Sequence, residues 1–342
     1  METGNLKKII NGFTKARILV VGDLILDQYI WGDVERISPE APVPVVWAKK
    51  RDYVPGGAAN VANNIVALGG KVVLCGVVGD IGYPTTKIFL DGVKKRGISA
   101  VGIFSEKARE TTLKTRIIAG HQQVVRVDWE DVHNIKKETN INLRRFISKN
   151  IKDFDAIIIE DYGKGLLDRD FTETIIQEAN IAKKIITVDP KEDNFDCYYK
   201  ATCITPNRKE AENAIRFLKM RDSANKFKIY QEKLFSDNDI TKAGNAILKH
   251  LKLESLLITL GEDGMWVFEK GKNKHIPTVA QEVFDVSGAG DTVIATFTMA
   301  LAVGASKLNA ATIANYTAGI VVGKLGTATA TRNELLERIG KK

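Results

Sequence analysis

The sequence predicts an α/β protein with a doubly wound, mostly parallel sheet, helices on both faces and a small antiparallel β lid. Short apolar runs rich in Val and Ile alternate with stretches of helical length, which is typical of a parallel sheet covered by helices. Two early segments, 28–54 and 109–130, break this alternation. In them apolar and polar residues alternate, as in half-exposed antiparallel strands.

The predicted elements follow one another in a regular order. The run "RILVVGDLILD" is expected to form one buried opening strand, and "GAANVANNIVALG" a helix with small residues on its face. "KVVLCGVVGD" predicts the next strand, and a helix follows at Thr85–Arg96. The apolar runs "DAIIIEDYG", "KIITVDP" and "SLLITLG" predict later buried strands. We expect one domain over residues 1–342, with a polar surface insertion at 219–238.

Composition and charge limit the classes of function. Hydrophobic residues make up 44% of the 342 residues and charged residues 27%, the profile of a soluble globular protein. The net charge of +8 comes from scattered lysines, without the basic clusters interleaved with aromatics that favour nucleic-acid binding. The three cysteines lack disulfide or zinc spacing. Without a signal core or a bilayer-length apolar run, we expect a cytoplasmic protein that binds neither nucleic acid nor membrane.

The stretch "DVSGAGD", Asp285 to Asp291, directly precedes an apolar run of helical length. Small residues before a helix expose unpaired backbone N–H groups, and the helix dipole adds partial positive charge there. Gly288, Ala289 and Gly290 are therefore expected to cradle an anion. The acid beside them has two interpretations. Asp291 could cap the helix, or it could take a proton from an attacking hydroxyl.

Polar or glycine-rich turns follow most of the predicted strands. Asp23 and Asp27 lie at the end of the first strand, and later strands run into "EDYGKG", "VDPK", "TPNRKE" and "TLGEDG". Each alone could be an ordinary turn. Ligands of open parallel sheets bind beyond the carboxyl ends of the strands. Taken together, these turns predict a single cleft, over which the lid would close.

Two motifs give the chain a family resemblance. "GGAANVANNIVALG" at Gly56–Gly69 and "DVSGAGD" together resemble the two signatures of the ribokinase-like (PfkB) sugar kinases, over about Arg17–Arg332. Ser287 stands where many relatives have Thr, which keeps the hydroxyl. Runs such as "GDLILDQYIWGDVERISPEAPVPVV", "HQQVVRVD", "EDYGKG" and "AGIVVGKLGTA" are similar to those of bacterial heptose 7-phosphate kinases. The sequence lacks the "HxGH"-like nucleotidyltransferase motif of the bifunctional relatives, so it resembles a stand-alone kinase.

The resemblance implies an ATP- and Mg²⁺-dependent kinase. It would phosphorylate the anomeric hydroxyl of D-glycero-D-manno-heptose 7-phosphate, a step in nucleotide-activated heptose synthesis. Asp291 would be the catalytic base, and the N–H groups of Gly288, Ala289 and Gly290 would stabilise the transferred phosphoryl group. A homodimer through the lid is also implied. The alternatives are a kinase of the same fold for another sugar, such as fructose 1-phosphate or ribose, and a non-catalytic sugar or nucleotide sensor.

The resemblance also assigns residues to the sugar side of the cleft. Gly56 and Gly57 would allow close backbone approach and a hinge. Asn60, Asp23 and Asp27 would bind sugar hydroxyls, although Asn60 could be a helix residue that faces solvent. A 7-phosphate needs cations, and both lid arginines could instead be solvated. The candidate cations are Arg116, Arg126, Lys164 and Lys191.

On the nucleotide side, "TPNRKEAE" resembles the Asn-x-x-Glu motif of the family. It implies that Asn207 and Glu210 place phosphate and Mg²⁺, the metal being held by Glu210 largely through water. Asn315 lies where relatives flank the adenine, although it could be a buried residue paired to backbone. The sequence has no GxxxxGK[ST] P-loop. The nucleotide-binding residues are thus expected to be Lys191, Asn207, Glu210, Thr259, Gly261, Gly264 and Asn315.

Overall fold

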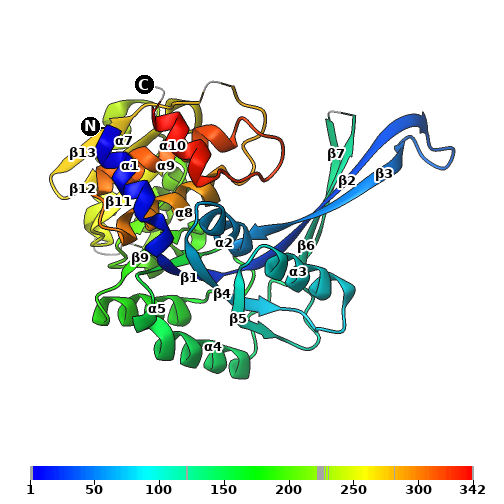
Figure 1. The fold of residues 1–342 in the computed structure, drawn as a ribbon, viewed down its shortest axis with the longest axis horizontal. Helices are drawn as coiled ribbons and strands as arrows, with labels where there is room; N and C mark the ends of the chain where they lie inside the picture. The colour runs from blue at the N-terminus through cyan, green and yellow to red at the C-terminus, as the bar shows by residue number, and fades with distance from the viewer. Residues whose placement is uncertain are drawn as a thin grey trace.

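The computed structural model describes residues 3–120, 122–221, 227, 229, 231–280 and 282–340. Within them the chain forms a large sheet with helices on both faces and a smaller sheet that projects from one side of the body (Figure 1). The predicted fold class is confirmed. None of the helices described is both long and apolar enough to cross a membrane.

The large sheet is mostly parallel. Within the described residues its strand order is β13-β12-β11-β10-β9-β8-β1-β4-β5, and only the edge pairs β11–β12 and β12–β13 are antiparallel. In that order the strands span Lys272–Ile276, Met265–Glu269, Ser255–Thr259, Cys203–Ile204, Ile185–Asp189, Ala156–Glu160, Arg17–Gly22, Lys71–Val78 and Ser99–Ser105.

Helices cover both faces of this sheet because its strands are apolar on both sides. In β1, Ile18 and Val20 join one core cluster, while Leu19 and Val21 join the other. The first cluster is closed by α1 (Thr3–Gly12), α2 (Ala58–Ala67), α3 (Pro84–Lys95), α8 (Ala289–Ala302), α9 (Lys307–Val321) and α10 (Arg332–Gly340). The second is closed by α4 (Lys137–Asn150), α5 (Arg169–Ile181), α6 (Arg208–Arg221) and α7 (Asp237–His250).

The small sheet is the predicted lid. Its order is β3-β2-β6-β7, with β2 at Leu24–Ile37, β3 at Pro44–Gly57, β6 at Thr112–Ala119 and β7 at Gln122–Trp129. The two outer pairs are antiparallel, whereas β2 and β6 run parallel in the middle. In each of these strands, successive side chains point to opposite faces of the sheet. One face of the sheet is turned toward the body.

One expectation about the strands is wrong. "RILVVGDLILD" does not form a single strand, because β1 ends at Gly22 and β2 begins the lid sheet at Leu24. Asp23 makes the break: its carboxylate accepts the backbone N–H groups of Tyr162 at 2.9 Å and Lys164 at 3.1 Å. The helix expected at Thr85–Arg96 is confirmed as α3. The expected insertion at 219–238 includes residues 222–226, 228 and 230, which lie outside the described residues.

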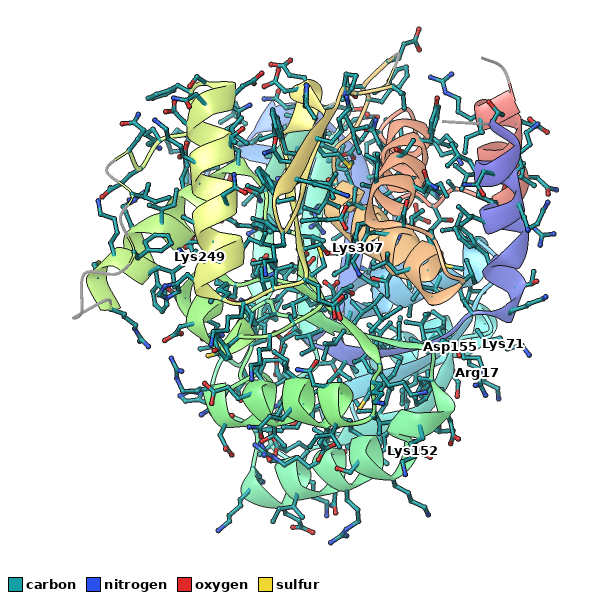
Figure 2. All side chains as sticks on the ribbon, turned by 90° about the vertical axis from the view of Figure 1, so that its left-hand side faces the viewer. Arg17, Lys71, Lys152, Asp155, Lys249 and Lys307 are labelled. Atoms are coloured by element: carbon teal, nitrogen blue, oxygen red, sulfur yellow. The ribbon has the colours of Figure 1, made fainter. Side chains whose placement is uncertain are left out.

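The charged residues at the amino ends of the strands differ from those at the carboxyl ends. At the edge where the strands begin, Arg17 and Asp155 form an ion pair at 3.6 Å, and Figure 2 shows Lys71 beside them. Lys307, also labelled there, pairs with Glu254 at 3.1 Å. At the opposite edge β8 and β9 end in two carboxylates, Glu160 and Asp189. Two neighbouring acids thus lie at the carboxyl ends of the strands, where the sequence predicts the cleft.

Candidate active site

Two adjoining cavities lie at the carboxyl ends of the strands. The first, about 360 Å³, lies between the lid sheet and the start of α8. The second, about 680 Å³, lies between the β11–β12 turn and helices α8 and α9. Thr259 and Gly290 line both cavities. Ligands in the two cavities would thus meet at the first turn of α8.

The first turn of α8 has the form expected of an anion cradle. Gly288 is the N-cap residue, with a φ of 77° and no side-chain cap. This left-handed conformation suits glycine. A Cβ on Gly290 would have no atom within 4 Å, so the backbone there borders open space. The Ala289 N–H donates to the Val286 carbonyl at 3.2 Å, so the expectation that it joins the cradle is wrong. The N–H groups of Gly288 and Gly290 are the ones placed to meet an anion in the cavities.

Asp291 is not the helix cap. It lies inside α8, and its carboxylate is held by side chains from two other elements. The Asn60 Nδ2 group donates to Oδ2 at 2.7 Å, and the Tyr162 hydroxyl donates to Oδ1 at 2.9 Å. The capping interpretation is therefore wrong, and the carboxylate instead lines the first cavity.

Burial sets the basicity of this carboxylate. Asp291 is 5% exposed, and desolvation raises its pKa to about 6, although the hydrogen bonds from Asn60 and Tyr162 oppose the rise. A carboxylate with this pKa is mostly ionised at neutral pH and is a stronger base than an ordinary aspartate. Both properties suit a general base.

Two further acids surround Asp291. Glu160, Asp189 and Asp291 each bring one oxygen within 4.8 Å of the others. Glu160 is fully buried, and neither of its carboxylate oxygens has a hydrogen-bond partner. Burial, followed by repulsion from Asp189 and Asp291, raises the pKa of Glu160 well above its usual value. Burial and Glu210 similarly raise the pKa of Asp189. Asp291, with two side-chain donors, is the best supported site for negative charge.

The lid supplies positive charge on the other side of the first cavity. Lys114, Arg116 and Arg126 all line it. The Arg116 guanidinium pairs with Asp27, whereas Arg126 Nε contacts Asp128 at 2.8 Å. Lys114 lies 3.8 Å from the same Asp128. Burial lowers the pKa of Lys114, and the neighbouring cations Lys164 and Arg126 lower it further, against the opposing effect of Asp128. An anion between these side chains would relieve their mutual repulsion.

The structure divides the residues predicted for the sugar side into two groups. Asp27, Gly57, Arg116 and Arg126 line the first cavity. Asp23, Gly56, Asn60 and Lys164 are not among its lining residues.

The residues of the second group contact protein atoms instead. Asp23 binds backbone N–H groups, and Asn60 holds Asp291. Lys164 Nζ contacts Glu130 at 2.7 Å. Gly56 lets Asp27 approach, since a Cβ there would lie 2.3 Å from Asp27 Oδ2.

The residues predicted for the nucleotide lie around both cavities. Asn207 and Glu210 line the first, yet they also cap α6 reciprocally: Asn207 N–H donates to Glu210 Oε2 at 2.8 Å, and Glu210 N–H to Asn207 Oδ1 at 3.0 Å. Gly261, Gly264 and Asn315 line the second cavity, Thr259 lines both, and Lys191 lines neither.

The apolar second cavity has one buried amide in its wall. Asn315 Nδ2 donates to the Pro277 carbonyl at 2.7 Å. Asn315 thus pairs with backbone, the alternative considered from the sequence, and also faces the cavity. Around it the wall is formed by Val283, Val286, Val293, Ala318 and Val322, a surface suited to a flat apolar ring.

The sequence reasoning missed several residues of the site, among them Asp189, which lies in the recognised run "VDPK". Lys114 precedes Arg116 by two positions on β6, so strand alternation could have placed both on one face. Tyr162 lies within the recognised run "EDYGKG", but no local pattern reveals that its hydroxyl reaches a residue 129 positions away. Glu160 ends an apolar strand, and its repulsion by Asp189 and Asp291 depends on how the strands assemble.

Known proteins resemble this chain along most of its length. The pattern of the pfkB carbohydrate kinase family matches residues 15–334. The chain belongs to this family.

Two relatives are both named bifunctional protein HldE. That of Helicobacter pylori strain J99 is 45% identical over 93% of the chain, and that of Pelobacter propionicus 40% over 99%. The chain spans 65% of the length of the first relative and 66% of the second.

Solved structures support the fold of this pfkB kinase. Ribokinase from Arabidopsis thaliana, complexed with ribose and ATP, superposes with a TM-score of 0.71 at 17% identity, covering 96% of this chain and 99% of that chain. Phosphofructokinase-2 from Escherichia coli gives 0.74 at 15% identity, with 95% and 98% covered. As a pfkB carbohydrate kinase, the protein is an ATP-using phosphotransferase that acts on a sugar hydroxyl group.

Proposed function

We propose that this kinase phosphorylates the anomeric hydroxyl of D-glycero-D-manno-heptose 7-phosphate, giving heptose 1,7-bisphosphate for the synthesis of a nucleotide-activated heptose and surface glycans such as lipopolysaccharide. One observation carries the proposal. Lys114, Arg116 and Arg126 line the same cavity as Asp291. A substrate that fills this cavity would present a hydroxyl to the carboxylate and an anionic group to the lid.

The chemistry assigned to the junction of the cavities is a direct phosphoryl transfer. Asp291 accepts the proton of the sugar hydroxyl while that oxygen bonds to the terminal phosphorus of ATP. The bond between this phosphorus and the ADP oxygen breaks, and its electron pair leaves with ADP. The N–H groups of Gly288 and Gly290 stabilise the charge on the transferred group, because they are already oriented at the helix end.

The lid cations are proposed to bind the distal phosphate. Arginine recognises phosphate through paired charge-assisted hydrogen bonds, and lysine acts as a point charge. In the structure Arg116 and Arg126 are paired with Asp27 and Asp128, so substrate binding would exchange carboxylate partners for phosphate oxygens. Asp27 would then be released to accept a sugar hydroxyl.

ATP is proposed to occupy the second cavity, with its phosphates directed toward Gly290 and Thr259. Mg²⁺ fits the adjoining wall by donor chemistry. Glu210 lines the first cavity, and burial raises its pKa, a cost that a nearby hard cation would offset. Glu210 would hold the ion through water. The ion, when bound, neutralises phosphate charge.

The remaining proposals concern assembly. We infer one kinase domain over residues 1–342, with lid segments at 28–54 and 109–130, that acts in the ATP-containing cytoplasm.

We also infer a two-fold homodimer through the lid. On β7, Val125, Val127 and Trp129 are 44%, 39% and 57% exposed. They alternate with Arg126 and Asp128 and so occupy the face away from the cavity. A second copy of the same sheet would cover this apolar face.

A substrate panel tests the proposed function. Purified protein would be assayed for ADP release with heptose 7-phosphate, fructose 1-phosphate, fructose 6-phosphate, ribose and unphosphorylated heptose. We expect the highest kcat/KM with heptose 7-phosphate and a large loss without its phosphate. Preference for another sugar phosphate would reassign the substrate while keeping the kinase chemistry. ATP binding without turnover of any sugar would instead favour a sensor.

A further inference from the structure

The turn after β8 holds Tyr162 in place beside Asp291. Asp23 accepts the Tyr162 N–H at 2.9 Å from one side. From the other, the Tyr198 hydroxyl donates to Asp161 Oδ2 at 2.7 Å. Gly165 has a φ of 83°, and a Cβ there would lie 2.0 Å from the His133 carbonyl oxygen. The backbone of the turn is thus fixed by buried contacts on both sides.

This fixed turn directs one hydroxyl at the carboxylate of Asp291. The Tyr162 hydroxyl donates to Oδ1 at 2.9 Å, and Asn60 Nδ2 donates to Oδ2 at 2.7 Å. Each carboxylate oxygen therefore has one side-chain donor. Tyr162 and Asp291 both line the first cavity, so the hydrogen bond lies beside the place where the substrate hydroxyl would bind.

We propose that Tyr162 is the positioning residue of the catalytic base: its hydroxyl fixes the Asp291 carboxylate and keeps it ionised for proton transfer. This inference rests on the proposed role of Asp291 and adds a function for the run "EDYGKG". A phenol suits the task, because burial and the nearby Asp291 raise the pKa of Tyr162 well above its usual value. It remains a neutral donor throughout the working pH range.

Lys114, Arg116 and Arg126 line the same cavity as Asp291, and the acids around it work in the opposite direction to the two donors. Asp27 from the lid raises the pKa of Asp291, in addition to the effect of burial. Glu160 on β8 and Asp189 on β9 also face it. With acids on three neighbouring elements, the ionised form is favoured by its two side-chain donors, Asn60 and Tyr162, and by a backbone hydrogen bond at Asp291 itself. Removing one donor should make the carboxylate harder to ionise.

The test compares Tyr162→Phe with the wild-type enzyme across pH 5 to 9. We expect kcat of Tyr162→Phe to fall by roughly 10- to 100-fold, the range that corresponds to the loss of one hydrogen bond to a charged group. We expect the acid limb of the kcat/KM profile to move up by about one pH unit, the equivalent of a tenfold change in the ionisation equilibrium. The KM for ATP should stay within about twofold, because the substitution leaves the second cavity unchanged.

Tyr198→Phe is the matched control. It removes the same atom from a buried tyrosine that supports the same turn but contacts Asp161. If Tyr198→Phe reproduces the loss and the shifted limb, general support of the turn explains the effect and the proposal is wrong. An unshifted limb with wild-type kcat in Tyr162→Phe would equally overturn it.

Asp291→Asn distinguishes this inference from the function on which it rests. Near wild-type turnover in Asp291→Asn would show that Asp291 is not the base, and the proposed function itself would be contradicted. A strong loss in Asp291→Asn, combined with an unaffected Tyr162→Phe, would contradict the positioning role alone. Thermal melting of all three variants, with and without ATP, would show whether each is folded and binds nucleotide.

Discussion

The two cavities differ in the way their walls are built. The first cavity, called here the lid cavity, is lined by charged side chains from strands β6 and β7 of the lid, such as Lys114, Arg116 and Arg126. The second cavity, called here the helix-lined cavity, is apolar, and its residues Val293 and Val322 are fixed in packed elements. Charged side chains on strands can exchange one partner for another, whereas an apolar wall selects by shape.

This difference separates the expected mutational effects. Changes in the lid cavity should alter the KM for the sugar substrate, and changes in the helix-lined cavity the KM for ATP. Changes at the junction, where Asp291 and Gly290 lie, should lower kcat.

The largest effect is expected at the junction. Asp291→Asn should lower turnover by at least about 10²-fold, because the amide cannot accept the proton. The shape is nearly unchanged, so melting temperature and ATP binding should be retained. Asp153→Asn, at an exposed position, is the control. Near wild-type turnover of Asp291→Asn in a coupled ADP-release assay would exclude Asp291 as the base.

The next effect is expected in the lid cavity. Arg116→Ala or Arg126→Ala should raise the KM for the sugar phosphate by roughly 10- to 100-fold, since an arginine–phosphate contact is charge-assisted and often bidentate. Steady-state kinetics should show little change in the KM for ATP. Arg36→Ala, an exposed arginine on the same sheet, should leave both constants alone. If neither cavity-lining arginine affects the sugar-phosphate KM, Lys114, Lys164 and Lys191 become the candidates.

A smaller effect is expected in the helix-lined cavity. Asn315→Ala removes the bond to the Pro277 carbonyl and should raise the KM for ATP by roughly 2- to 10-fold, the range for one neutral hydrogen bond. The sugar KM should be unchanged. Asn245→Ala, which removes a similar 2.9 Å bond to the Thr241 carbonyl in α7, is the control. An equal rise in both KM values would contradict the separation of the two cavities.

The outer face of the lid provides a further comparison. Val127→Asp places a charge on the apolar face proposed to meet a second copy, and burying an unpaired charge is costly. Light scattering should then give a mass close to half that of the wild-type dimer. Val101→Asp changes another exposed valine, on β5, and should leave the mass unaltered. A monomeric wild-type protein would contradict the dimer directly.

The smallest effect concerns stability. The pKa of Glu160 is raised in the folded state, so the folded protein binds this proton more tightly than the unfolded chain. Stability therefore falls as pH rises above about 4.3, the unfolded value. Glu160→Gln should remove that loss. Its melting temperature should match the wild type near pH 4 and exceed it at pH 8, by about 1–2 °C for each 1 kcal/mol of stability gained.

Calorimetry from pH 4 to 8 measures this difference. Glu337→Gln, at an exposed position of α10, should give a difference that does not change with pH. A gap between Glu160→Gln and the wild type that narrows as pH rises would show that the Glu160 carboxylate is stabilised by its surroundings.

The sequence by itself determined the layers, the lid and the location of the chemistry. Alternating apolar runs and helical stretches predicted the sheet, because burial on both faces leaves a pattern in any single strand. Alternation on β6 and β7 predicted the lid for the same local reason. The small residues before α8 predicted an anion cradle, since helix termini have unpaired N–H groups whatever the rest of the fold.

Only the tertiary structure decided which groups share the site. Asn60 and Tyr162 come from separate parts of the chain, and their donation to Asp291 follows from the placement of α2 and the β8 turn against α8. The break at Asp23 likewise depends on distant N–H groups. Side-chain pairing across elements leaves no periodic trace in the sequence, and a pKa depends on burial and on neighbours that only folding brings together.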